Sequence, residues 1–177
     1  SLEMSPEVNL FFAFDANTAQ KVKQAIAEHK SQTERTDYIG VAQYSMKYAA
    51  GLGRRYNLSG KNTQYAHSFT VGHIKDGKIN EPDLTKSQVI VFGNNSVTQK
   101  GPVIRIKDIP LIFISPHPDD MEIAAGGLVE LTSKNKVGVI NMVMTRGARG
   151  VILTEEQKAR GIDAGLLRIH EVTKAAQ

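Results

Sequence analysis

The chain has 177 residues, 41% of them hydrophobic, which is enough for one packed domain or two small ones. It contains no cysteine, so disulfides, thiolate metal sites and cysteine nucleophiles are all excluded. The net charge of +4 comes from basic residues spread along the chain, a pattern that argues against a nucleic-acid-binding surface.

Two helices are predicted near the start of the chain. In residues 16–30, Ala19, Val22 and Ile26 recur at spacings of three and four residues, as on one face of a helix. Residues 38–52 repeat this pattern, and Gly51 and Gly53 are expected to end the helix. The stretch YAHSFTVGHI, residues 65–74, is rich in aromatic and β-branched residues and favours a strand.

The middle of the chain, residues 75–108, is predicted to be a linker followed by a hairpin. Residues 75–86, KDGKINEPDLTK, combine turn formers with charge, as linkers do. The runs SQVIVF (87–92) and PVIRIK (102–107) flank a polar loop, an arrangement typical of a β-hairpin.

Residues 109–177 have a different pattern, in which short apolar strands alternate with helices. The strand LIFIS is followed by an amphipathic stretch over residues 121–135 and by the apolar run VGVINMVM. Strands that are apolar on both faces belong to sheets covered on both sides, so strand, helix and strand here predict a parallel βαβ unit. We therefore predict an α/β fold: a Rossmann-like parallel sheet with helices on both faces, incomplete or rearranged, plus the β-hairpin.

Metal-binding residue types follow the first of these strands. His117, Asp119 and Asp120 lie in the turn PHPDD, and the polar loop from Thr145 to Gly150 follows the second strand. Carboxyl ends of parallel strands meet at one edge of a sheet, so the two loops should meet at one crevice. Imidazole and carboxylate are ligands that Zn²⁺ accepts. The alternative is an aspartate pair that only begins a helix, beside a solvated histidine.

Several motifs of this last segment together resemble a known enzyme family. PHPDD, the glycine pair Gly126 and Gly127, the string T-R-G-A-R-G and R-I-H-E resemble the amino-terminal half of the PIG-L/LmbE-like zinc-dependent N-deacetylases. The resemblance implies that His117 and Asp120 are zinc ligands and that Asp119 is the base that activates water. It also implies hydrolysis of an N-acetyl amide on an amino-sugar conjugate, such as one of N-acetylglucosamine, or on a similar small acylated amine.

The resemblance also suggests residues for substrate binding. Arg168 and Glu171 match the family's R-x-x-E and are expected to contact the sugar or to orient the loops. Arg146 and Arg149 stand where the family more often has acidic or small residues, which points to an anionic group on the substrate. The glycines between these arginines would also suit a phosphate held by backbone amides.

The family's third zinc ligand, a histidine in a late loop, has no counterpart in this chain. The stretch from Lys21 to Gln32 and the sequence up to residue 74 are similar to the family's closing helices, with His67 where a glutamate is usual. The chain would then run family end first and family beginning last. An enzyme and a non-catalytic binding or scaffold protein of the same fold both fit, as does a homo-oligomer that completes its sites by exchange of segments.

Two further expectations concern location and partners. No stretch approaches the roughly 18 consecutive apolar residues of a membrane helix, so no membrane partner is expected. The start of the chain lacks a basic region before an apolar core, and a cytoplasmic location is predicted on that basis.

Overall fold

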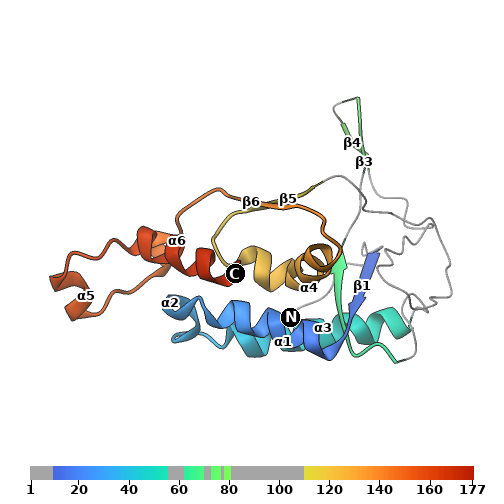
Figure 1. The fold of residues 1–177 in the computed structure, drawn as a ribbon, viewed down its shortest axis with the longest axis horizontal. Coiled ribbons are helices and arrows are strands. Elements are labelled where there is room, and N and C mark those ends of the chain that lie inside the picture. The colour runs from blue at the N-terminus through green and yellow to red at the C-terminus, as the bar shows by residue number, and fades with distance from the viewer. Residues whose placement is uncertain (1–9, 56–61, 70–72, 77, 81–109) are drawn as a thin grey trace. The chain divides into compact units, whose positions relative to one another are not determined.

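The computed structural model describes residues 10–55, 62–69, 73–76, 78–80 and 110–177, which form helices and short strands (Figure 1). The predicted α/β class is confirmed. The chain divides into two compact units, one of residues 1–16 and 45–107 and the other of residues 17–44 and 108–177. These units cut across the predicted segments 1–74, 75–108 and 109–177, because helices from the start of the chain pack with its last third.

The first unit contains an antiparallel strand pair. Strand β1 (Leu10–Phe14) pairs with β2 (Tyr65–Phe69), so that Phe12 lies opposite His67. Helix α3 (Tyr38–Arg55) crosses the boundary between the units, and its later turns contribute Ala49 and Ala50 to a buried cluster with Ala66. The strand predicted over 65–74 is thus confirmed over its first half.

A tight hairpin occupies the start of the predicted linker. Strands β3 (His73–Lys75) and β4 (Lys78–Asn80) pair so that Lys75 lies opposite Lys78. Asp76 has φ of 52°, the left-handed conformation that two-residue hairpin turns require and that aspartate tolerates. The hairpin predicted over 87–92 and 102–107 lies outside the described residues.

The second unit is built on the predicted βαβ arrangement, which the structure confirms. Strand β5 (Leu111–Ser115) and strand β6 (Val139–Val143) are parallel neighbours, with Leu111 beside Val139 and Ser115 beside Val143. Helix α4 (Asp120–Lys134) connects them and packs on one face of the pair (Figure 1). It buries Ala125 and Leu128, at the spacing expected for a helix face turned to a core.

The rest of this unit begins with the short η1 (Ala148–Gly150) and α5 (Glu155–Ala159). Helix α6 (Ala164–Ala175) follows. Helices α5 and α6 both begin with a side-chain cap. Thr154 and Gln157 form a capping box on α5, and Asp163 accepts a hydrogen bond of 2.8 Å from the amide of Leu166 in α6.

Helices α1 (Ala16–Ala27) and α2 (Lys30–Thr33) supply the other side of this unit. Val22 of α1 packs closely against Gly126 of α4: a Cβ added to Gly126 would lie 3.1 Å from Cγ1 of Val22. The Lys21 ammonium also lies 2.7 Å from the Glu130 carboxylate. The absence of a side chain at Gly126 therefore lets α4 pack closely against α1.

The second face of the strand pair departs from the expectation of helices on both faces. Its large apolar side chains are solvent-exposed in the described part of the chain, namely Ile112, Ile114, Ile140, Met142 and Met144. The only crossover helix between β5 and β6 is α4, and one crossover can cover only one face. Two described strands therefore form a sheet with a single covered side.

Candidate metal-binding turn and its supports

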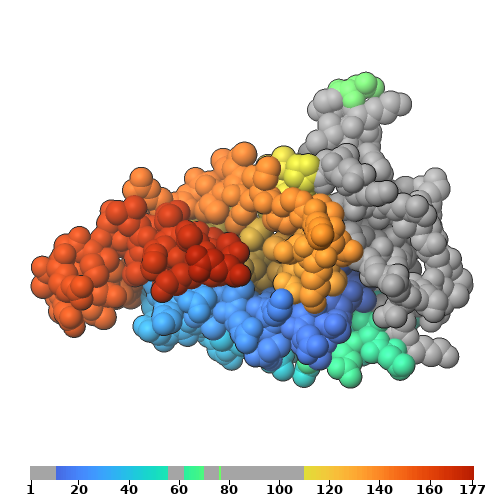
Figure 2. All heavy atoms as spheres, in the orientation of Figure 1, coloured from blue at the N-terminus to red at the C-terminus, as the bar shows by residue number. Residues whose placement is uncertain are grey.

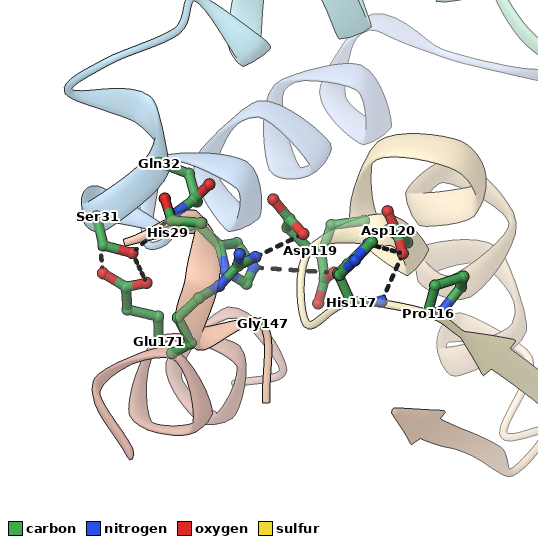
Figure 3. Close-up of polar contacts among 12 residues, drawn as sticks. His29, Ser31, Gln32, Pro116, His117, Asp119, Asp120, Gly147 and Glu171 are labelled. Atoms are coloured by element: carbon green, nitrogen blue, oxygen red, sulfur yellow. Dashed lines mark hydrogen bonds and ion pairs between the residues drawn. The ribbon is translucent and has the colours of Figure 1, made fainter. Parts of the chain in front are cut away.

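The turn after β5 brings His117 and Asp120 together. The amide of His117 donates a hydrogen bond of 2.6 Å to Oδ2 of Asp120, and Nδ1 of the His117 ring lies 3.3 Å from the same oxygen (Figure 3). These side chains are 56% and 39% exposed. An imidazole nitrogen and a carboxylate oxygen thus lie side by side, open to solvent, at the start of α4. Both predicted ligands occupy one small site.

Asp119, which stands between them in the sequence, makes its ion pair with Arg168 of α6. It occupies the N-cap position of α4, but its side chain makes no capping hydrogen bond. Instead Oδ1 lies 2.6 Å from Nη2 of Arg168, and both side chains are at least nine-tenths buried. A buried carboxylate needs such a partner, because burial without one leaves its charge uncompensated. Arg168 therefore fixes the orientation of the predicted base.

Glycines in the next loop make room for Arg168. Gly147 has φ of 63°, and a Cβ there would lie 2.9 Å from Nη1 of Arg168 and 3.1 Å from Cδ of Pro118. A Cβ on Gly150 would lie 3.3 Å from the same Nη1. The glycines of T-R-G-A-R-G therefore admit the Arg168 side chain. The phosphate interpretation of this string stays a prediction.

Glu171 is bound within the protein as well. Its carboxylate accepts hydrogen bonds of 2.7 Å from the amide and from the hydroxyl of Ser31 in α2 (Figure 3). Glu171 and Arg168 are both buried. Of the two roles expected for the R-x-x-E pair, the geometry favours orienting the surrounding segments over touching a substrate.

The loops after β5 and β6 meet, as predicted from the parallel strands. The hydroxyl of Thr145 donates a hydrogen bond of 2.8 Å to the carbonyl of Pro116. Arg146 and Arg149 are exposed, and the stem of Arg146 lies against Gly165 of α6. These arginines are therefore the members of the predicted substrate set whose side chains reach solvent.

Residues 29–35 also hold the loop after β6 and helix α4 in place, and no sequence pattern predicted these contacts. Gln32 and Arg35 donate hydrogen bonds of 3.2 Å and 2.8 Å to the carbonyl of Gly150. His29 is buried, with Nε2 3.8 Å from Oε2 of Glu122 in α4. The one signal in the sequence was the similarity of Lys21–Gln32 to a closing helix of the deacetylase family.

Comparison with known families was made for the whole chain. Residues 112–177 match the family model PIG-L, described as GlcNAc-PI de-N-acetylase. This segment is PIG-L-like. The match confirms the family predicted from the sequence, over less than half of the chain. No curated protein and no solved structure matches the chain.

The PIG-L-like segment contains both of the predicted zinc ligands, His117 and Asp120. Nitrogen of His117 and oxygen of Asp120 fit zinc in kind, whereas catalytic zinc sites usually have three protein ligands. Among the described residues no cluster of three or more His, Asp or Glu side chains is placed to bind a metal ion. In addition, no described helix is long and apolar enough to span a bilayer.

Proposed function

We propose that this chain supplies the His117–Asp120 part of a metal-dependent N-deacetylase site that hydrolyses the acetyl amide of an amino-sugar conjugate. The observation that carries the proposal is the 3.3 Å contact between Nδ1 of His117 and Oδ2 of Asp120 on an exposed turn. Its location at the carboxyl end of a parallel strand, in a segment that matches PIG-L, supports it further.

In the proposed reaction, water adds to the acetyl carbonyl and the C–N bond breaks, giving acetate and a free amine. His117 and Asp120 would hold the zinc ion, which when bound polarises the carbonyl and acidifies water. Asp119 takes the proton of the attacking water and gives it to the departing nitrogen. Arg168 holds the Asp119 carboxylate in a fixed orientation through the 2.6 Å contact.

The exposed arginines suggest which substrates fit. Arg146 and Arg149 lie on the loop tied to the metal-binding turn by the Thr145–Pro116 hydrogen bond. Guanidinium groups bind phosphate and carboxylate strongly, so an amino sugar that carries an anionic group is the favoured substrate class. A third metal ligand must come from outside the described residues.

The test is release of free amine from an N-acetylglucosamine conjugate by the full chain with added zinc. We expect Asp119→Asn to lower the rate by a factor of about 100 or more while zinc stays bound. His117→Ala should lose both zinc and activity, and the matched control His170→Ala, at an exposed histidine of α6, should lose neither. Absence of turnover by the zinc-loaded protein would contradict the proposal.

A non-catalytic binding or scaffold protein is the second candidate. Two observations favour it: Asp119 is already bound to Arg168, and the described residues complete no metal site. In that case Asp119→Asn should change only stability, because the Asp119–Arg168 contact would serve only to connect α4 to α6. The activity and metal measurements on the same variants decide between the two candidates.

A further inference from the structure

A pocket of about 620 Å³ lies within the second unit, away from the metal-binding turn. It is bounded by α1, α4, β6 and the end of α6. Its walls are partly apolar, with Val22, Ala25, Val129 and Val139 among the lining residues. Figure 2 shows the surface hollowed between the dark red end of α6 and the orange atoms beside it. This volume is in the range of small-molecule sites.

Glu122 lines this pocket with an unsatisfied carboxylate. The residue is 4% exposed, and neither carboxylate oxygen has a hydrogen-bond partner among the described residues. Nε2 of His29 lies 3.8 Å from Oε2 of Glu122, beyond hydrogen-bond distance. A buried carboxylate without a donor is costly, so a ligand that brings a positively charged donor would be bound strongly.

Asn141 on β6 provides a second unsatisfied group in the same pocket. Its Oδ1 accepts a hydrogen bond of 2.8 Å from the Ser115 hydroxyl, which leaves the amide nitrogen to donate. That nitrogen is buried and has no partner in the described part of the chain. The pocket thus offers an anionic acceptor and a neutral donor, both already buried.

The pocket is separate from the metal-binding turn. Asp120 and Glu122 are two positions apart on α4, which places their side chains about 200° apart around the helix. Asp120 is exposed on one side, whereas Glu122 belongs to the stripe with Gly126, Val129 and Ser133 that faces the pocket. A ligand bound at Glu122 therefore would not occupy the His117 site.

We propose that this pocket binds a small molecule that carries a cationic amine and an oxygen acceptor. The amine would donate a hydrogen bond to the Glu122 carboxylate, and the oxygen would accept one from the Asn141 amide nitrogen. An anionic ligand is disfavoured by the buried carboxylate. A metal ion is disfavoured because the described residues contain no cluster of three or more His, Asp or Glu side chains that could bind one. The rest of the pocket wall favours a compact, partly apolar carbon frame between amine and oxygen.

A matched pair of probes tests this site. Trans-4-aminocyclohexanol has the amine and the hydroxyl, and trans-cyclohexane-1,4-diol replaces the charged amine with a neutral group of similar size. We expect the amine, and not the diol, to cause saturable shifts in the methyl resonances of Val22, Val129 and Val139 of the full chain. Equal shifts with both probes, or none with either, would overturn the proposal.

Variants separate this site from the proposed catalytic turn. Glu122→Gln should weaken amine binding about tenfold or more, because it removes the charge and keeps the shape. Glu28→Gln, at a half-buried acidic residue lining the same pocket, is the matched control and should bind as the wild type does. Unchanged binding in Glu122→Gln would contradict the proposal. His117→Ala should bind the amine normally, so failure of the deacetylase proposal leaves this result unaffected.

Discussion

Nη2 of Arg168 lies 2.6 Å from Oδ1 of Asp119, and both side chains are at least nine-tenths buried. The contact joins the N-cap residue of α4 to the middle of α6. It links the predicted base to a residue 49 positions later in the sequence. The fold and the candidate site therefore depend on the same ion pair.

Replacing Arg168 should destabilise the protein strongly. Arg168→Met leaves Asp119 buried without its partner, and such a change typically costs about 3 to 5 kcal/mol. The double variant Arg168→Met, Asp119→Leu should recover part of the loss, because no buried charge remains. Urea unfolding measures both. The control Arg160→Ala, at an exposed arginine, should change the free energy of unfolding by less than about 0.5 kcal/mol. Equal effects at the two arginines would contradict the role given to the ion pair.

Removing the Glu171 carboxylate should loosen α2 from α6. Glu171→Ala deletes two charge-assisted hydrogen bonds to Ser31, with an expected cost of about 2 to 3 kcal/mol. Ser31→Ala keeps the amide donor and removes the hydroxyl, which donates to Glu171 and accepts a longer hydrogen bond from Gln32, and it should cost about 1 kcal/mol. Hydrogen exchange of the amides in residues 30–33 should rise in both variants, more in the first. Unaltered exchange in Glu171→Ala would show that α2 is held by other contacts.

Two glycines with nearly the same backbone separate conformational strain from crowding. Gly147 and Gly161 have φ of 63° and 67°, but only Gly147 faces close neighbours. Gly161→Ala should cost only the left-handed penalty, about 1 to 2 kcal/mol. Gly147→Ala should cost more, because the added methyl group meets the Arg168 guanidinium. Equal losses in thermal unfolding would mean that Arg168 moves aside freely.

The stability of the first unit should fall in mild acid because of His67. Its ring is buried against Phe14 and Phe69, and burial lowers the pKa of His67 from 6.5 to about 4. Between these values the unfolded chain binds a proton that the folded chain does not. The stabilisation is therefore complete above pH 6.5 and is lost as the pH falls towards 4, by about 3 kcal/mol at most. His67→Phe should remove this pH dependence from urea unfolding, whereas a persistent dependence would place its origin elsewhere.

The sequence predicted the local elements of the second unit well, for physical reasons. Apolar runs such as LIFIS, followed by a helical period, leave few alternatives to a βαβ unit, and parallel strands bring their following loops together. The juxtaposition of His117 with Asp120 follows from their separation of three positions in the sequence. Such short-range relationships can be predicted from spacing alone.

The supports of the site could not be predicted in the same way. Ser31 and Glu171 are 140 positions apart, and their contact depends on how α1 and α2 pack with the last third of the chain. No local pattern shows that Arg168 turns inward, since arginine is usually exposed. The exposed outer face of β5 and β6 also differs from the prediction. Apolar residues on both faces of a strand indicate that both faces are buried, but they do not identify the segments that would cover each face.

The most direct test of the account is zinc binding by the full chain, measured by isothermal titration alongside His117→Ala, Asp120→Ala and the control His170→Ala. We predict about one zinc ion per chain in the wild type and in His170→Ala, and none in the other two variants. No zinc binding by the wild-type chain, or binding that survives loss of His117, would contradict the assignment of this turn as a metal-binding site.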